Sequence, residues 1–122
     1  MTEKDDLAFI EHILDSIKAI EKFSKNINKE KLMLNRLKQS AIVREIEIIG
    51  EAVKNISESL KNKHPEIQWK EIAGTRDKMV HHYFGVDLNI VWDIVKINLP
   101  DLKSKILKIK SEEKARITLR GK

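Results

Sequence analysis

The first predicted element is an amphipathic helix over residues 4–25. Its apolar side chains recur in steps of three and four, which places them on one stripe of a helix. The stripe consists of Leu7, Ile10, Ile13, Leu14, Ile17, Ile20 and Phe23. The pattern breaks at residues 26–28, where Asn28 is suited to cap the start of a second helix. Because the break is short, the two helices should be antiparallel neighbours.

A second, longer helix is predicted from residue 28 to residue 60, because helical spacing of apolar residues continues over most of this stretch. Residues 41–52 are apolar on more of the helix circumference than one core face requires. We therefore expect a surface outside the monomer's own core, most simply a second copy of the chain, to contact Ile48 or Ile49. Gly50 indicates either close approach of another backbone or a glycine that the helix tolerates.

The charged side chains of this helix are predicted to form a solvated face whose members pair with one another. They are Arg44, Glu45, Glu47 and Glu51.

Two further helices are predicted in the second half of the chain. Pro65 ends the long helix, and a third helix begins near Trp69 and stops close to Gly85. Asp87 caps a fourth helix, which Pro100 must kink or restart. There is no period-two alternation that would predict a strand. The sequence thus predicts an all-α protein, an antiparallel bundle of four or five helices, with one domain over residues 1–110 and a basic tail over residues 111–122.

Length and composition fit one folded domain. The chain has 122 residues, of which 41% are hydrophobic and 35% charged. The absence of cysteine excludes disulfides and thiolate metal sites and favours an intracellular location. No apolar run approaches the length of a membrane span, and the first six residues are too acidic for a signal peptide. We therefore expect a cytoplasmic protein without membrane contact.

The net charge of +5 is unevenly distributed. Residues 96–122 carry nine bases against three acids, so the rest of the chain is close to neutral. A basic tail favours attraction to nucleic acid through counterion release, and a solubilising helix end is an equally good explanation.

The chemically richest stretch is residues 76–83, which combines Arg76, His81, His82 and Tyr83. A fixed cation, a group that titrates near neutrality and a hydroxyl are the groups that a phosphate-handling site needs. In a ribonuclease that uses no metal, His81 would transfer protons and Arg76 would bind the phosphate.

A purely structural role is the alternative for this stretch. In that case Arg76 would pair with Asp77 or Glu71, and the histidines would cap a helix end. A metal site is less well supported, because adjacent histidines diverge on a helix and no set of ligands is complete.

On a regular helix Arg76 and His81 would not share a face, because five positions correspond to about 140° around the axis. Either the helix ends near His81, or a second chain contributes to the site. Both can hold together.

The spacing Arg76, four residues, His81, one residue, Tyr83 matches the R-x4-H-x-Y signature of HEPN-domain proteins. The chain resembles in particular the HepT toxins of the DUF86 family. Three flanking segments resemble that family too: residues 42–52, 64–74 and 83–87. The similarity runs from about residue 4 to residue 108.

This resemblance implies a HEPN-like homodimer whose paired motifs line a composite cleft and cleave RNA without a metal or other cofactor, leaving a cyclic phosphate. Arg76 and His81 would be catalytic, and Asp77 and His82 are auxiliary candidates. The implied partner is a minimal nucleotidyltransferase antitoxin that transfers AMP to Tyr83, which would block the cleft with anionic bulk. The alternative is a non-catalytic HEPN module that binds a nucleotidyltransferase and helps to form its substrate cleft.

Overall fold

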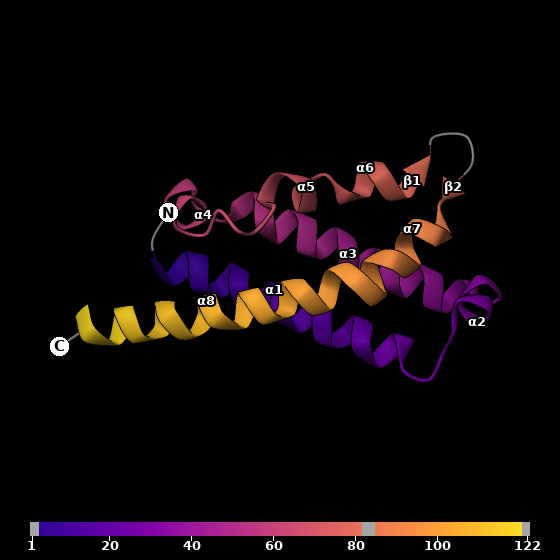
Figure 1. The fold of residues 1–122 in the computed structure, drawn as a ribbon, viewed down its shortest axis with the longest axis horizontal. Coiled ribbons are helices and arrows are strands. Elements are labelled where there is room, and N and C mark those ends of the chain that lie inside the picture. The colour runs from indigo at the N-terminus through magenta and orange to yellow at the C-terminus, as the bar shows by residue number, and fades with distance from the viewer. Residues whose placement is uncertain (1–2, 82–84, 121–122) are drawn as a thin grey trace.

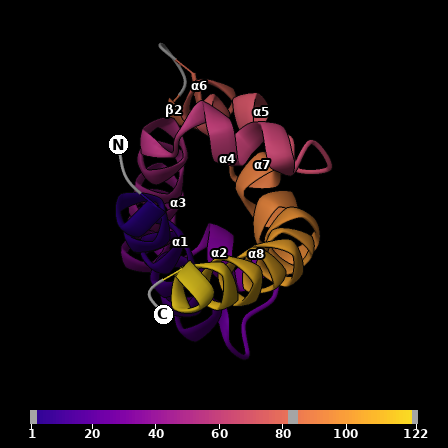
Figure 2. The ribbon, with the colours of Figure 1, turned by 90° about the vertical axis from the view of Figure 1, so that its left-hand side faces the viewer.

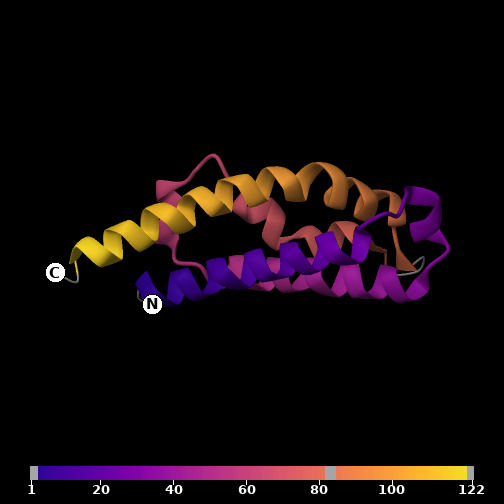
Figure 3. The same cartoon turned by 90° about the horizontal axis from the view of Figure 1, so that it is seen from below.

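Three long helices form the body of the protein. A computed structural model describes residues 3–81 and 85–120, with side chains for 5–80 and 85–119. The long helices are α1 (Glu3–Ser24), α3 (Arg36–Asn55) and α8 (Leu99–Arg120). Helix α1 runs antiparallel to both α3 and α8 (Figures 1 and 3). The start of α1 and the end of α8 lie at one end of the elongated molecule, and α2 and the strands β1 and β2 lie at the other (Figure 1).

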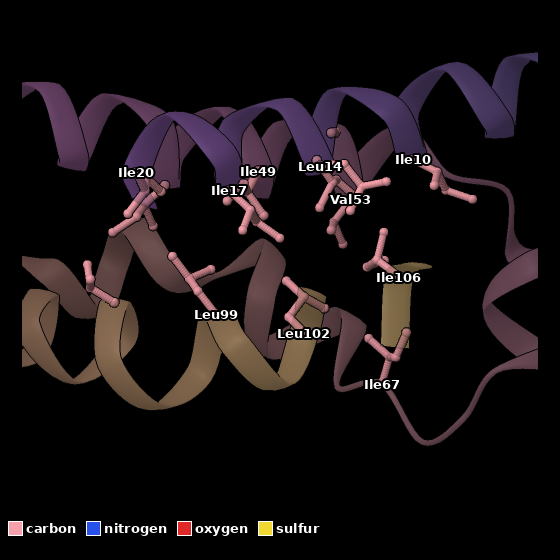
Figure 4. Packing of buried hydrophobic residues seen from close by; sticks show 14 of the residues in the cluster. Ile10, Leu14, Ile17, Ile20, Ile49, Val53, Ile67, Leu99, Leu102 and Ile106 are labelled. Atoms are coloured by element: carbon pink, nitrogen blue, oxygen red, sulfur yellow. The ribbon is translucent and has the colours of Figure 1, made fainter. Parts of the chain in front are cut away.

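The core lies where these helices face one another. Side chains from α1 and α3 point toward α8, which closes the core from the opposite side (Figure 4). The end-on view shows the same helices arranged around this centre (Figure 2). The predicted stripe on α1 is confirmed in its central part, where five residues are at most 1% exposed: Ile10, Ile13, Leu14, Ile17 and Ile20.

The prediction of one continuous helix over residues 28–60 is wrong. The structure has α2 (Lys29–Met33), α3 and α4 (Glu58–Lys63) in its place. Asn35 interrupts the helix because its side chain accepts a hydrogen bond from the backbone N–H of Lys38 and so caps α3. The predicted cap at Asn28 is confirmed, since its side chain accepts from the backbone N–H of Lys31.

The second interruption of that stretch lies at Ser57, which caps α4 through a bond from the backbone N–H of Leu60. Ser57 is held in turn by Asp6 of α1. The Asp6 carboxylate accepts from the Ser57 backbone N–H at 2.8 Å and from its hydroxyl at 2.6 Å. Asp6 is 7% exposed, so a buried carboxylate on α1 fixes the end of α3 and the start of α4.

The predicted third helix is divided into two short ones, α5 (Trp69–Ala73) and α6 (Thr75–Met79). Beyond α6 the chain forms a two-residue antiparallel ladder, which the sequence did not predict. Its strands are β1 (Val80–His81) and β2 (Gly85–Val86), with Val80 opposite Val86 and His81 opposite Gly85. Gly85 has a φ of 74°, a left-handed conformation that favours glycine.

The predicted irregularity at Pro100 is confirmed. Helix α7 (Leu88–Asp93) continues into a π-helical turn, η1 (Ile94–Asn98), and α8 begins at Leu99. Proline lacks the N–H that a regular helix would use, so it fits the first turn of a restarted helix. The Asp87 cap is also confirmed, because its side chain accepts from the backbone N–H groups of Asn89 and Ile90.

Helix α8 runs across residue 110 without interruption. The bases of its second half contact α1: Lys110 and Lys114 lie 3.1 and 3.9 Å from the carboxylate of Glu11. Lys114, which belongs to the predicted tail, is thus paired within the fold.

The all-α prediction is confirmed, and within residues 3–81 and 85–120 the short ladder is the one departure from it. No helix in the described part of the chain is long and apolar enough to span a membrane.

Candidate functional site

Helix α6 carries Arg76 close to the middle of α3. The break that separates α6 from α5 is stabilised by Thr75, whose hydroxyl donates to the carbonyl oxygens of Ile72 and Glu71 at 2.8 and 3.1 Å. Carbonyl oxygens at the end of a helix have no N–H partner in the next turn, and the Thr75 hydroxyl supplies a donor there. Arg76 therefore begins a new helical turn rather than continuing the old one.

Arg76 forms an ion pair with Glu47 of α3. Its Nε atom lies 3.5 Å from Oε2 of Glu47, and 65% of the arginine side chain is exposed. The sequence suggested Asp77 or Glu71 as the partner, and it placed Glu47 among residues that pair along their own helix. In the structure the partner of Arg76 is Glu47, which lies 29 positions earlier in the chain.

The helix that carries Arg76 ends before His81, as one of the two sequence alternatives proposed. Its last residue is Met79, whose carbonyl oxygen accepts from the backbone N–H of Asp87 at 2.7 Å. The backbone of His81 then pairs with Gly85 in the ladder. The side chain of His81 lies outside the described part, as do His82 and Tyr83, so their roles stay predictions.

A groove of about 530 Å³ runs along the outer face of α3 beside Arg76. Its walls come from α3 and from the junction of α5 with α6. Side chains of both charges line it: Arg44, Glu47, Glu51, Lys54, Arg76 and Asp77. Glu51 pairs with Lys54 at 3.2 Å, one turn along the same helix. Arg76 thus lies in an open, polar groove that is accessible to an extended anionic ligand.

A second groove, of about 400 Å³, follows the amino-terminal half of α3 toward β2 and α7. It is lined partly by Arg36 and Val86, and it shares Arg44 and Glu47 with the first groove. The two grooves therefore meet on α3 at the residue that pairs with Arg76.

The opposite side of α5 and α6 borders a different hollow, of about 380 Å³, next to η1 and α8. Lys78 and Glu66 line it, whereas Arg76 and Asp77 do not. The pKa of the Glu66 carboxyl lies below its ordinary value, first because of a hydrogen bond from its own backbone N–H and then because of His64. His64 Nδ1 is 3.2 Å from this carboxylate. This hollow contains none of the predicted site residues.

No group of three or more histidine, cysteine, aspartate or glutamate side chains that could hold a metal ion occurs in the described part of the chain. The absence of a metal from the reaction stays a prediction, since His82 lies outside that part.

Comparison with known proteins gives the family. The family model described as "Ribonuclease HepT-like" matches residues 13–109, which include Arg76, His81 and Tyr83. The chain belongs to the HepT-like ribonuclease family. The resemblance that the motif and its flanks indicated is thereby confirmed.

Relatives of full domain length support the same assignment. A protein from Thermococcus cleftensis named "Probable ribonuclease HepT" is 44% identical over 102 residues, which cover 84% of this chain and 93% of the relative. A "Putative RNase" from Caldanaerobacter subterraneus is 40% identical over 106 residues, or 87% of this chain and 95% of the relative. No solved structure gives a significant match.

One relative is larger. A Methanocaldococcus jannaschii protein named "Gamma-glutamylcyclotransferase and putative RNase" is 43% identical over 109 residues. These residues cover 89% of this chain but 49% of that relative, so the chain spans about half of its length.

Glu47 is the candidate site residue that sequence reasoning missed. No local signal could have revealed it, because its ion pair depends on how α6 crosses α3. Gly50 was a partial signal. The backbone at the end of α5 packs against Gly50, and a Cβ atom added there would lie 3.4 Å from the carbonyl oxygen of Ile72 and 3.6 Å from that of Ala73. These are ordinary contact distances, so both explanations of this glycine stay open.

Proposed function

We propose that this HepT-like protein is a metal-independent endoribonuclease toxin that uses Arg76 and His81. The observation that carries the proposal is the family match, which covers the whole R-x4-H-x-Y motif. The structure supports it with an exposed arginine in an open groove. A guanidinium with free N–H groups is well suited to bind a phosphodiester.

The proposed reaction is an internal transfer at phosphorus. His81 takes the proton of the 2′-hydroxyl, the 2′-oxygen attacks the adjacent phosphorus, and the bond to the 5′-oxygen breaks. The leaving oxygen takes up a proton, so the products are a 2′,3′-cyclic phosphate and a 5′-hydroxyl. Arg76 stabilises the negative charge that builds on the phosphoryl oxygens.

We propose that the active form is a homodimer. The attacking and leaving oxygens lie on opposite sides of the phosphorus, so one imidazole does not reach both, and a second His81 would complete the acid–base pair. The outer face of α3 offers a surface for the second copy: Leu37 is 80% exposed and Ile48 is partly exposed beside the groove. Ile49, which the sequence also placed at this contact, is 2% exposed and belongs to the monomer's own core.

RNA cleavage in the presence of EDTA tests the nuclease proposal. The variants Arg76→Ala and His81→Ala should each lower kcat/KM by about a hundredfold or more, because they remove transition-state stabilisation or proton transfer. Lys78→Ala is a matched control, since Lys78 lies on the same short helix but faces the other hollow.

Equal cleavage by the wild type and both variants would contradict the assignment of the catalytic residues. The non-catalytic HEPN module predicts a different result: normal binding of a nucleotidyltransferase and no cleavage by any of the proteins.

We further propose that a minimal nucleotidyltransferase antitoxin regulates the toxin by transferring AMP to Tyr83. The phosphate of the AMP would bring negative charge and bulk to a site that binds phosphate. The intact mass of protein coexpressed with its cognate nucleotidyltransferase should rise by one or more AMP units. Tyr83→Phe should abolish that rise, and an unchanged rise in this variant would place the modification elsewhere.

A further inference from the structure

We propose that Glu47 is a positioning residue for Arg76, a role that deepens the proposed nuclease function and rests on it. Glu47 lies on α3 and Arg76 on α6, and the contact between Oε2 and Nε is 3.5 Å. Two thirds of the Glu47 side chain is covered, whereas most of the Arg76 side chain is exposed. The carboxylate is thus the more fixed of the two partners.

The atom that Glu47 contacts decides what Arg76 can still do. A guanidinium has five N–H donors, and Nε carries only one of them. Contact at Nε leaves the two terminal amino groups free for a bidentate contact with a phosphate. A carboxylate that occupied the terminal groups would compete with RNA, whereas a carboxylate at Nε orients the guanidinium toward the groove.

Glu47 pairs with Arg76 in preference to a base on its own helix. Arg44 lies three positions before Glu47, a spacing that permits an ion pair on a helix. Within the described side chains, however, Arg76 is the one ion-pair partner of Glu47, and Arg44 forms no ion pair. The geometry between α3 and α6 therefore determines the pairing.

A second contact between α3 and this part of the chain lies one turn further along α3, at Gly50. Gly50 has no side chain between α3 and the carbonyl oxygens of Ile72 and Ala73 at the end of α5. Glu47 and Gly50 are three positions apart on α3. Ala73 and Arg76 are also three positions apart, at the junction of α5 with α6. The contact of α5 with Gly50 and the ion pair of Arg76 with Glu47 therefore have the same spacing along the two segments.

This arrangement predicts a specific kinetic effect. Glu47→Gln removes the charge that orients Arg76, so kcat should fall about tenfold as the arginine becomes less well placed. The same change makes the groove more positive, so KM for RNA should stay the same or decrease. A residue with a purely structural role would lower the melting temperature without this separation of kcat from KM.

The matched control is Glu45→Gln. Glu45 is on the same helix and its substitution changes the net charge equally, but it lines neither groove on α3. We expect Glu45→Gln to keep kcat within about twofold of the wild type. Unchanged kcat in Glu47→Gln, or an equal fall in both variants, would overturn the positioning role.

A second measurement does not depend on cleavage. The ¹⁵N–¹H signal of Arg76 Nε can be identified by its absence in Arg76→Lys. Glu47→Gln should shift this signal and Glu45→Gln should not, even if the wild type proves unable to cleave RNA. In that case the nuclease proposal fails while the ion pair stands. An Arg76 signal that is unchanged in Glu47→Gln would reject the positioning role itself.

Discussion

At the scale of single residues, the contact between Asp6 and Ser57 shows how one carboxylate can end one helix and begin another. Asp6 accepts both the backbone N–H and the hydroxyl of Ser57, and it is almost fully buried. Ser57 uses its own oxygen to cap α4. The carboxylate at the centre of this network is charged, and its loss leaves two partly buried donors of Ser57 without a partner.

Replacing Asp6 by alanine should therefore lower the free energy of unfolding by about 2 kcal/mol, because hydrogen bonds to charged groups are stronger than neutral ones. Asp6→Asn should recover part of the loss, since an amide oxygen can still accept one of the two bonds. Urea unfolding followed by circular dichroism measures both effects.

Asp15→Ala is the control for that experiment, because Asp15 is an exposed aspartate on the same helix. It should change the stability by no more than about 0.5 kcal/mol. Equal stability of Asp6→Ala and wild type would contradict the capping role of Asp6.

Single residues also show which contacts could not be predicted from the sequence. The motif residues Arg76, His81 and Tyr83 could be recognised because their spacing is local. The partners of Arg76 and Ser57 could not, since they lie 29 and 51 positions away. A tertiary contact of this kind leaves no periodic signal in one sequence.

At the scale of elements, apolar periodicity predicted α1 well and the middle of the chain poorly. The helical spacing of apolar residues continues on both sides of Asn35 and Ser57. It therefore gave no sign that both residues interrupt the helix with side-chain hydrogen bonds. Such bonds compete with the backbone pattern of a helix. Predictions were more accurate where the apolar pattern itself breaks beside a capping residue or a proline, as the cap at Asp87 and the restart near Pro100 show.

Helix α3 has two different sides. Its inner side contributes to the core, and its outer side carries Leu37, Ala41, Arg44 and Ile48 in one stripe beside both grooves. The sequence indicated that residues 41–52 of this helix are apolar on more of the circumference than one core face requires. It could not separate Ile48 from Ile49, because adjacent residues differ by about 100° around the axis and the orientation of the helix was unknown.

At the scale of the whole molecule, the sequence predicted the all-α architecture, and the proposed homodimer rests on the outer face of α3. A homodimer through the outer face of α3 would cover an exposed leucine and extend the groove with a second copy. The proposed acid–base pair would then come from two chains. Dimerisation and cleavage should consequently be lost together.

Leu37→Glu and Ile48→Glu should each weaken the dimer by about a hundredfold, because they place a charge in an apolar contact. Sedimentation or light scattering should show a monomer, circular dichroism should show that it is folded, and the RNA assay should show little cleavage. Ile97→Glu is the control, since Ile97 is 66% exposed on η1 and away from α3. A dimer that survives both α3 variants would exclude this interface.

The position of α8 has a consequence for the order in which the protein folds. Helices α1 and α3 can pair early, because they are close in the chain and are synthesised before α8. Their buried face is completed by Leu99, Leu102 and Ile106 of α8, which lies at the end of the described chain (Figure 4). A nascent chain therefore keeps an open apolar surface until α8 has been synthesised, and the fold that carries the groove closes only then.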